Sequence, residues 1–296
     1  MNAAVGTKLL LGVLLSMAWS LSAQAQTLTS FTATYQGGSS SCGTTYAIKG
    51  KEPNTLGTYP VFVYMVGTSE TYDNASALNA VDEMASRGYV AATIQYPNSS
   101  FGACSTLTTR AKCIFDAASA TSAIKALCSR PYADCSKGIV VGGFSQGSIM
   151  AILAKNYDAR VQAAYGLGAG VQYSLYDLRA CVADGKRTLT SDRLRAVNGE
   201  ADSFMGGSES SVRGQFQELT GLTCTSTSTS CVRSNDSGWY LVKHAEASDG
   251  NADHCYMRQG GCGLSNQNTL DQKWLAGTYS WSLDPNLAWL TRFTTR

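Results

Sequence analysis

The sequence predicts an α/β fold with a doubly wound, mostly parallel sheet in a single domain. Short, nearly continuous apolar runs, typical of buried strands, alternate with segments of helical spacing. No internal repeat or interdomain linker interrupts that alternation. The chain has 296 residues, which is enough for one α/β domain with a sizeable core.

The first 25 residues are predicted to be a secretory signal peptide and not part of the fold. Lys8 supplies the positive charge, Leu9 to Leu21 the apolar stretch, and Ala23-Gln-Ala25 the cleavage site. We therefore expect a secreted or periplasmic protein whose folded domain covers residues 26–296. No later run approaches about 20 apolar residues, so no membrane span is expected.

The charge balance excludes some classes of partner. The formal net charge of +2 becomes +1 once Lys8 is removed (2 − 1). The chain carries no basic stripe and no acidic tail, so nucleic-acid binding and electrostatic attachment to membranes are not expected. A near-neutral surface suits an uncharged or insoluble substrate. The sequence leaves the oligomeric state open.

The first half of the domain is expected to begin with two strands around a Gly/Ser-rich turn. A buried strand ending at Gly67 follows, and then a helix that Gly88 terminates. Another buried strand ends before Pro97, and a helix of about 20 residues comes next. In order, the bounds are strands Leu28–Tyr35, Thr45–Ile48 and Tyr59–Val66, helix Asn74–Arg87, strand Tyr89–Tyr96 and helix Leu107–Cys128.

The second half keeps the same alternation. It opens with the apolar strand from Gly138 to Gly143, and residues 169–192 are long enough for a small cap-like insertion. The further elements are helix Ile149–Lys155, strands Val161–Leu167 and Arg193–Asn198, helix Ser210–Leu222, strand Trp239–His244 and helix Pro285–Phe293.

All ten cysteines follow the predicted signal peptide. An even number in an exported chain favours disulfides, although connectivity does not follow from sequence. A structural zinc site is not favoured, because the chain has two histidines and no C-x-x-C pair. If neighbouring cysteines pair, the bonds are Cys104–Cys113, Cys128–Cys135, Cys224–Cys231, Cys255–Cys262 and, by remainder, Cys42–Cys181.

The most informative segment is a Gly-x-Ser-x-Gly turn, Gly143-Phe-Ser145-Gln-Gly147, between an apolar strand and a helix-compatible run. Such a turn lifts a serine hydroxyl out of the sheet, and its small residues avoid a Cβ clash. Ser145 is therefore the candidate nucleophile.

A serine hydroxyl is a weak nucleophile and needs a base, which a third group orients. His254 lies in a loop after the last predicted strand, where catalytic groups collect in open α/β sheets. His244 falls inside the apparent strand and is expected to have no catalytic role. His254 is therefore the candidate base.

The orienting acid is expected between the serine and the histidine in chain order. Asp202, just after the penultimate strand, is the candidate. Glu200 lies close enough to take its place, and Asp249 lies on the histidine's own loop. Both stay open as alternatives.

An oxyanion hole needs two preorganised N–H donors. The backbone N–H of Gln146, the residue after the nucleophile, is expected to supply one. The loop after the strand Tyr59–Val66, most plausibly through Thr68, is expected to supply the other.

Three motifs carry a resemblance to a known family: Gly143-Phe-Ser145-Gln-Gly147, Gly199-Glu-Ala-Asp202 and Asp253-His254-Cys255. With them, the chain resembles a secreted member of the α/β-hydrolase superfamily. The resemblance is to dienelactone-hydrolase-like esterases and bacterial polyester depolymerases. It implies a serine nucleophile, a histidine base, a carboxylate and no cofactor or metal, in a catalytic domain over residues 26–296. Two features depart from that family: Val66-Gly67-Thr68 replaces its usual His-Gly, and the cysteine density is high.

The expected function is the hydrolysis of small or polymeric carboxylic esters. Aromatic residues adjoining the site could line an apolar pocket: Tyr72, Phe144, Phe204 and Tyr256. Two other classes stay open. One is a serine peptidase or amidase on the same scaffold, and the other is a non-catalytic binding module that kept the fold.

Overall fold

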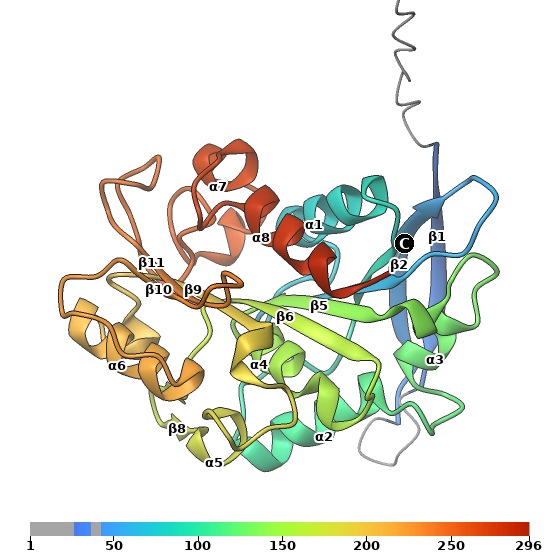
Figure 1. Ribbon diagram of the computed structural model, residues 1–296, viewed down its shortest axis with the longest axis horizontal. Coiled ribbons are helices and arrows are strands. Elements are labelled where there is room, and N and C mark those ends of the chain that lie inside the picture. Colours follow the sequence, from blue (N-terminus) through green and yellow to red (C-terminus); the bar gives the residue numbers. More distant parts are fainter. Residues whose placement is uncertain (1–26, 37–42, 296) are drawn as a thin grey trace, which may run out of the picture.

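A nine-stranded sheet forms the centre of the molecule (Figure 1), seen in a computed structural model that describes residues 27–36 and 43–295. Its six central strands, from β4 to β11, are parallel. The edge strands β1 and β10, and β2 next to β1, pair antiparallel to their neighbours. Across the sheet the order is β1 (Leu28–Tyr35), β2 (Tyr46–Pro53), β4 (Val90–Ile94), β3 (Val61–Met65), β5 (Ile139–Phe144), β6 (Val161–Leu167), β9 (Leu194–Gly199), β11 (Gly238–Val242) and β10 (Ser230–Val232).

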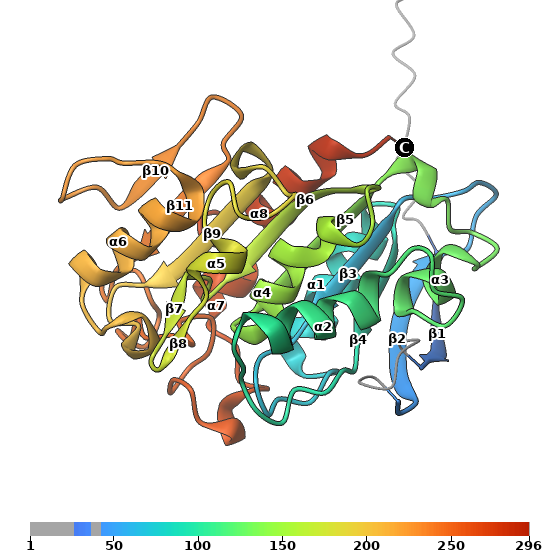
Figure 2. The same cartoon turned by 90° about the horizontal axis from the view of Figure 1, so that it is seen from below.

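Helices cover both faces of this sheet (Figures 1 and 2). One layer contains α1 (Ala75–Ser86), α7 (Gln272–Ala276) and α8 (Leu283–Leu290). The other contains α2 (Cys104–Phe115), α3 (Ala123–Cys128), α4 (Gln146–Leu153), α5 (Arg179–Val182) and α6 (Glu209–Thr220). Because both faces are covered, strands β3, β4 and β5 are buried along their whole length, as expected of a parallel sheet.

The predicted α/β class with a mostly parallel sheet is confirmed. Strands β1 and β6 have the predicted bounds. Helix α1 begins where expected, since the Asn74 side chain accepts a hydrogen bond from Ala77 N at 3.1 Å. None of the described helices has both the length and the apolar character needed to cross a membrane. The predicted signal peptide lies outside the described residues.

The predicted single helix from Leu107 to Cys128 is wrong. Helix α2 ends at Phe115, and Ser122 begins α3 by accepting a hydrogen bond from Lys125 N at 3.2 Å. In the connection, the Asp116 carboxylate accepts from Ala118 N at 3.0 Å. Short polar side chains that bond to the nearby backbone compete with helix continuation.

Three predicted disulfides are confirmed: Cys128–Cys135, Cys224–Cys231 and Cys255–Cys262. The predicted Cys104–Cys113 and Cys42–Cys181 bonds are wrong, because Cys104 is bonded to Cys181. Cys104 and Cys113 are nine positions apart on α2, which places them on opposite faces of the helix and about 13 Å apart along its axis. Cys113 is disulfide-bonded too, and Cys42 lies outside the described residues.

Residues 169–192, which are long enough for a small cap-like insertion, lie between β6 and β9. This segment contains a two-stranded hairpin, β7 (Gln172–Tyr173) and β8 (Tyr176–Asp177), followed by α5. The Cys104–Cys181 disulfide fastens α5 to the start of α2. The hairpin was not predicted, because two-residue strands leave no periodic signal in the sequence.

Candidate active site

Ser145 occupies a strained turn between β5 and α4. Its backbone has φ 52° and ψ −119°, a conformation that costs a non-glycine residue energy and that clusters at functional sites. Ser145 N donates to Leu167 O on the neighbouring strand at 2.8 Å. A Cβ at Gly147 would lie 2.1 Å from Met65 O, and one at Gly143 would lie 2.4 Å from Gly147. The two glycines of the motif are therefore required by packing.

His254 and Asp202 form a buried hydrogen-bonded pair. His254 Nδ1 lies 2.7 Å from Asp202 Oδ2, and their exposed fractions are 3% and 0%. The other carboxylate oxygen, Oδ1, accepts from Phe204 N at 2.9 Å and Met205 N at 3.2 Å. The carboxylate is fixed by the backbone after β9, so it holds the imidazole through Nδ1 and leaves Nε2 as the nitrogen able to exchange a proton.

Ser145 and His254 line the same cleft, a cavity of about 310 Å³. In the part of the chain that the structure describes, no hydrogen bond joins the serine hydroxyl to the imidazole; such bonds are often long in unliganded enzymes. The backbone of Gly168 lies against the ring, since a Cβ there would be 2.6 Å from His254 Cε1. The apolar walls of the cleft are Phe101, Phe144, Tyr173, Tyr176, Phe204 and Leu264.

The two predicted oxyanion donors have free backbone N–H groups. Among the described residues, neither Thr68 N nor Gln146 N donates to a protein acceptor, and Thr68 lines the cleft. The side chain of Gln146 joins the two segments, donating from Nε2 to Thr68 Oγ1 at 3.3 Å and to Ser100 O at 2.7 Å. Both N–H groups therefore remain available to an oxygen in the cleft.

A buried ion pair between Glu70 and Arg258, which sequence reasoning missed, links the Thr68 loop to the His254 loop. Both residues line the cleft, and the exposed fractions of the Glu70 and Arg258 side chains are 3% and 1%. Arg258 Nη2 donates to Glu70 Oε1, while Glu70 Oε2 accepts from Gly67 N at 2.9 Å. The two residues are 188 positions apart, so no local pattern in the sequence could have paired them.

The alternative acids and the second histidine lie in other networks. Glu200 pairs with Lys243 and accepts from His244 N. Asp249 accepts from Asn251 N at 2.9 Å and Gly260 N at 2.8 Å. His244 is exposed, and it lies beyond the end of β11 at Val242 rather than inside the strand as predicted. None of the three lines the cleft.

Two of the four aromatic residues expected near the site, Phe144 and Phe204, line the cleft; Tyr72 and Tyr256 do not. The β7–β8 hairpin contributes Tyr173 and Tyr176 instead. Burial raises the pKa of the Tyr173 hydroxyl, which donates to Gly168 O behind the imidazole. This tyrosine therefore remains neutral and acts as part of the wall.

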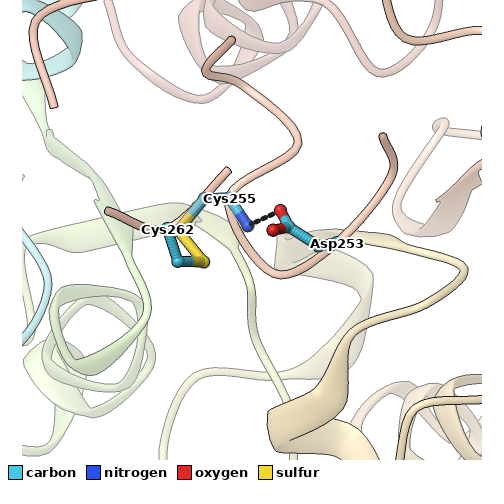
Figure 3. Close-up of side chains that lie close together, drawn as sticks. All are labelled: Asp253, Cys255 and Cys262. Atoms are coloured by element: carbon cyan, nitrogen blue, oxygen red, sulfur yellow. Dashed lines mark hydrogen bonds between the residues drawn. A yellow bond between two sulfur atoms is a disulfide. The ribbon is translucent and has the colours of Figure 1, made fainter. Parts of the chain in front are cut away.

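The disulfide Cys255–Cys262 closes the loop that begins beside His254 (Figure 3). Both cysteines line the cleft. The adjacent Asp253 carboxylate accepts from Cys255 N at 2.7 Å. Although Asp253, Cys255 and Cys262 lie close enough to hold an ion, the two sulfurs are bonded to each other and are not thiolate ligands.

Comparisons with known proteins do not identify a family. No protein-family model matches the chain, and no curated protein matches it. Among solved structures, a similar chain is the hypothetical protein PA2218 from Pseudomonas aeruginosa, with 18% identity and a TM-score of 0.39. The alignment covers 59% of this chain and spans about half, 52%, of that one.

Proposed function

We propose that this protein is a carboxylic ester hydrolase of the α/β-hydrolase type that works through an acyl-enzyme. The observation that carries the proposal is the arrangement of three side chains. Ser145, in a strained turn, shares a cleft with His254, and the imidazole is bonded through Nδ1 to buried Asp202 at 2.7 Å. Nucleophile, base and orienting acid are the components of acyl transfer.

In the first half-reaction, Ser145 Oγ attacks the ester carbonyl while His254 Nε2 accepts the hydroxyl proton. The carbonyl oxygen becomes an oxyanion, which the N–H groups of Gln146 and Thr68 stabilise. When the C–O bond to the alcohol breaks, the imidazolium gives its proton to the departing alkoxide. The products are an acyl-serine and a free alcohol.

In the second half-reaction, a water molecule attacks the acyl-serine and His254 takes one of its protons. Collapse of the tetrahedral adduct releases the carboxylic acid, and the proton returns to Ser145. Asp202 stabilises the imidazolium in both steps without itself being protonated. The apolar walls of the cleft favour an aliphatic or aromatic acyl group over a charged one.

The test is turnover of p-nitrophenyl butanoate by the purified, oxidised protein and by Ser145→Ala. We expect measurable turnover for the wild type and a loss of roughly 10⁴-fold or more for the variant. Near-ultraviolet circular dichroism must show that the variant is folded. Retained turnover in a folded variant would exclude Ser145 as the nucleophile. Turnover of an anilide at a rate similar to the ester would favour an amidase instead.

A further inference from the structure

A second cavity, of about 340 Å³, adjoins the catalytic cleft. We call it the side cavity. It lies between one face of α6, including Ser211, Gly214 and Glu218, the segment carrying Gln172 and Arg179, and the turn after Asp202. Positions 211, 214 and 218 are spaced by three and four residues, so they share one face of the helix.

The side cavity and the cleft share a wall made of Ser174 and Phe204, since both residues line both cavities. Ser174 N donates to Phe204 O at 3.0 Å. This hydrogen bond ties the tip of the β7–β8 hairpin to the turn that carries Asp202. We call this shared wall the ridge. A substrate lying over the ridge would occupy both cavities at once.

The ridge lies on the histidine side of the cleft. The rings of Phe204 and His254 have centroids 4.7 Å apart. In the proposed reaction the imidazole passes its proton to the departing alkoxide, so the alcohol half of the ester must lie beside His254. The alcohol half is therefore the part of a substrate that extends over Phe204 toward the side cavity.

Among the described residues, the lining of the side cavity is more polar than that of the cleft and holds no uncompensated cation. The Arg179 guanidinium is paired with Glu218 at 3.0 Å and with Asp177 at 3.1 Å, which disfavours an anionic ligand. In the described part of the chain, the hydroxyls of Ser174 and Ser203 form no hydrogen bond to protein. Each hydroxyl can donate and accept, so together they suit a ligand with neutral hydroxyl groups.

We infer that the side cavity binds the alcohol half of the substrate, and that this half is a neutral, hydroxyl-bearing group such as a polyol. This inference rests on the proposed function and extends it from the ester bond to the two halves of the substrate. The apolar cleft holds the acyl group and the polar side cavity holds the alcohol.

Gly214 offers a way to fill the side cavity without disturbing the catalytic residues. It is exposed on α6, and a Cβ built there meets no atom within 4 Å. Gly214→Trp places a bulky side chain at the cavity. Gln217→Trp is the matched control, because Gln217 is exposed on the same helix and lines the neighbouring surface pocket but not the side cavity. Because Gly214 also borders a neighbouring surface pocket, Ser211→Tyr, one helical turn away, provides a second blocking variant.

The experiment compares kcat/KM for methyl 3-phenylpropanoate and 1-glyceryl 3-phenylpropanoate, which share an acyl group. We expect the wild type and Gln217→Trp to prefer the glyceryl ester by about tenfold, the effect of one or two hydrogen bonds. Gly214→Trp and Ser211→Tyr are expected to remove most of that preference by lowering kcat/KM for the glyceryl ester.

Equal rates for the two esters in the wild type would overturn the inference while leaving the proposed function intact. A preference that survives in either blocking variant, folded as judged by its thermal melting curve, would also overturn it. If the wild type cleaves neither these esters nor p-nitrophenyl butanoate, the proposed function itself fails, and the inference fails with it.

Discussion

The serine side and the histidine side of the site are held in different ways. On the serine side, residues 143–147 are fixed by backbone packing, with glycine required where Gly147 approaches Met65 O. On the histidine side, the backbone is irregular, and Asp202 and the Cys255–Cys262 disulfide hold the loop. The Glu70–Arg258 pair joins the two sides.

This difference indicates which changes each side tolerates. A turn fixed by close backbone contacts has little freedom to adjust, so an added methyl group is costly. A loop held by side-chain contacts can lose one contact and keep its fold, while its functional group loses its position. Substitutions on the serine side should therefore reduce stability, and those on the histidine side should mainly reduce activity.

The largest expected effect is that of Asp202→Asn on activity. An asparagine cannot stabilise an imidazolium and favours the wrong tautomer, so kcat for a p-nitrophenyl ester should fall by about 10⁴-fold. The matched control is Glu200→Gln, two residues away, which should retain most of the activity because Glu200 pairs with Lys243 outside the cleft. The opposite ranking of the two variants would reassign the acid to Glu200.

Next is Gly147→Ala, which tests the serine side. The new Cβ would lie 2.1 Å from Met65 O, so strand and helix must move apart, at a cost of about 3–5 kcal/mol in unfolding free energy. Gly214→Ala, in open space on α6, should instead stabilise by about 0.5–1 kcal/mol. Urea unfolding of the two variants measures this difference, and an unchanged midpoint for Gly147→Ala would contradict the account of the serine turn.

A smaller effect on activity is expected when the link between the sides is broken. Arg258→Met leaves the buried Glu70 carboxylate without its cation and frees the Thr68 loop, so kcat should fall by about 10²-fold. Glu70→Gln should give a similar loss, and the double variant should lose little more than either single one. Additive losses would show that the two residues act independently.

The smallest expected effect is that of Glu200→Gln on stability. Burial raises the pKa of Glu200, but its ion pair with Lys243 and the hydrogen bond from His244 N outweigh this effect, so the pKa is lowered overall from 4.5. A lowered folded-state pKa contributes stability above the unfolded pKa and loses it as the pH falls through the folded value. The unfolding free energy of the variant should be about 1 kcal/mol lower than that of the wild type at pH 7. This difference in unfolding free energy should disappear below about pH 4. A stability difference that does not change with pH would contradict a stabilising role for the ionised Glu200 carboxylate.

The contrast between the two sides also explains how much the sequence could predict. The strand–turn–helix at Ser145 is a local pattern, and its glycines and apolar flanks are visible within 20 residues. The α/β class with a mostly parallel sheet follows from the same kind of local signal and is confirmed. Asp202 and His254 are predicted from their places after strands, and in the structure His254 Nδ1 lies 2.7 Å from Asp202 Oδ2.

What the sequence could not supply depends on contacts between distant segments. Cys104 pairs with Cys181 across 77 residues rather than with its neighbour on the helix. Glu70 and Arg258, and the hairpin that completes the cleft, have no signature that separates them from ordinary surface residues. The hydrolase fold itself and the signal peptide stay predictions.

The central claim, that Ser145 is an activated nucleophile, is tested most directly by labelling the oxidised protein with a fluorophosphonate probe and mapping the modified peptide. We predict a single adduct on Ser145, absent from Ser145→Ala and strongly slowed in Asp202→Asn. A folded wild-type protein that gains no label, or that is labelled at another serine, would contradict the claim.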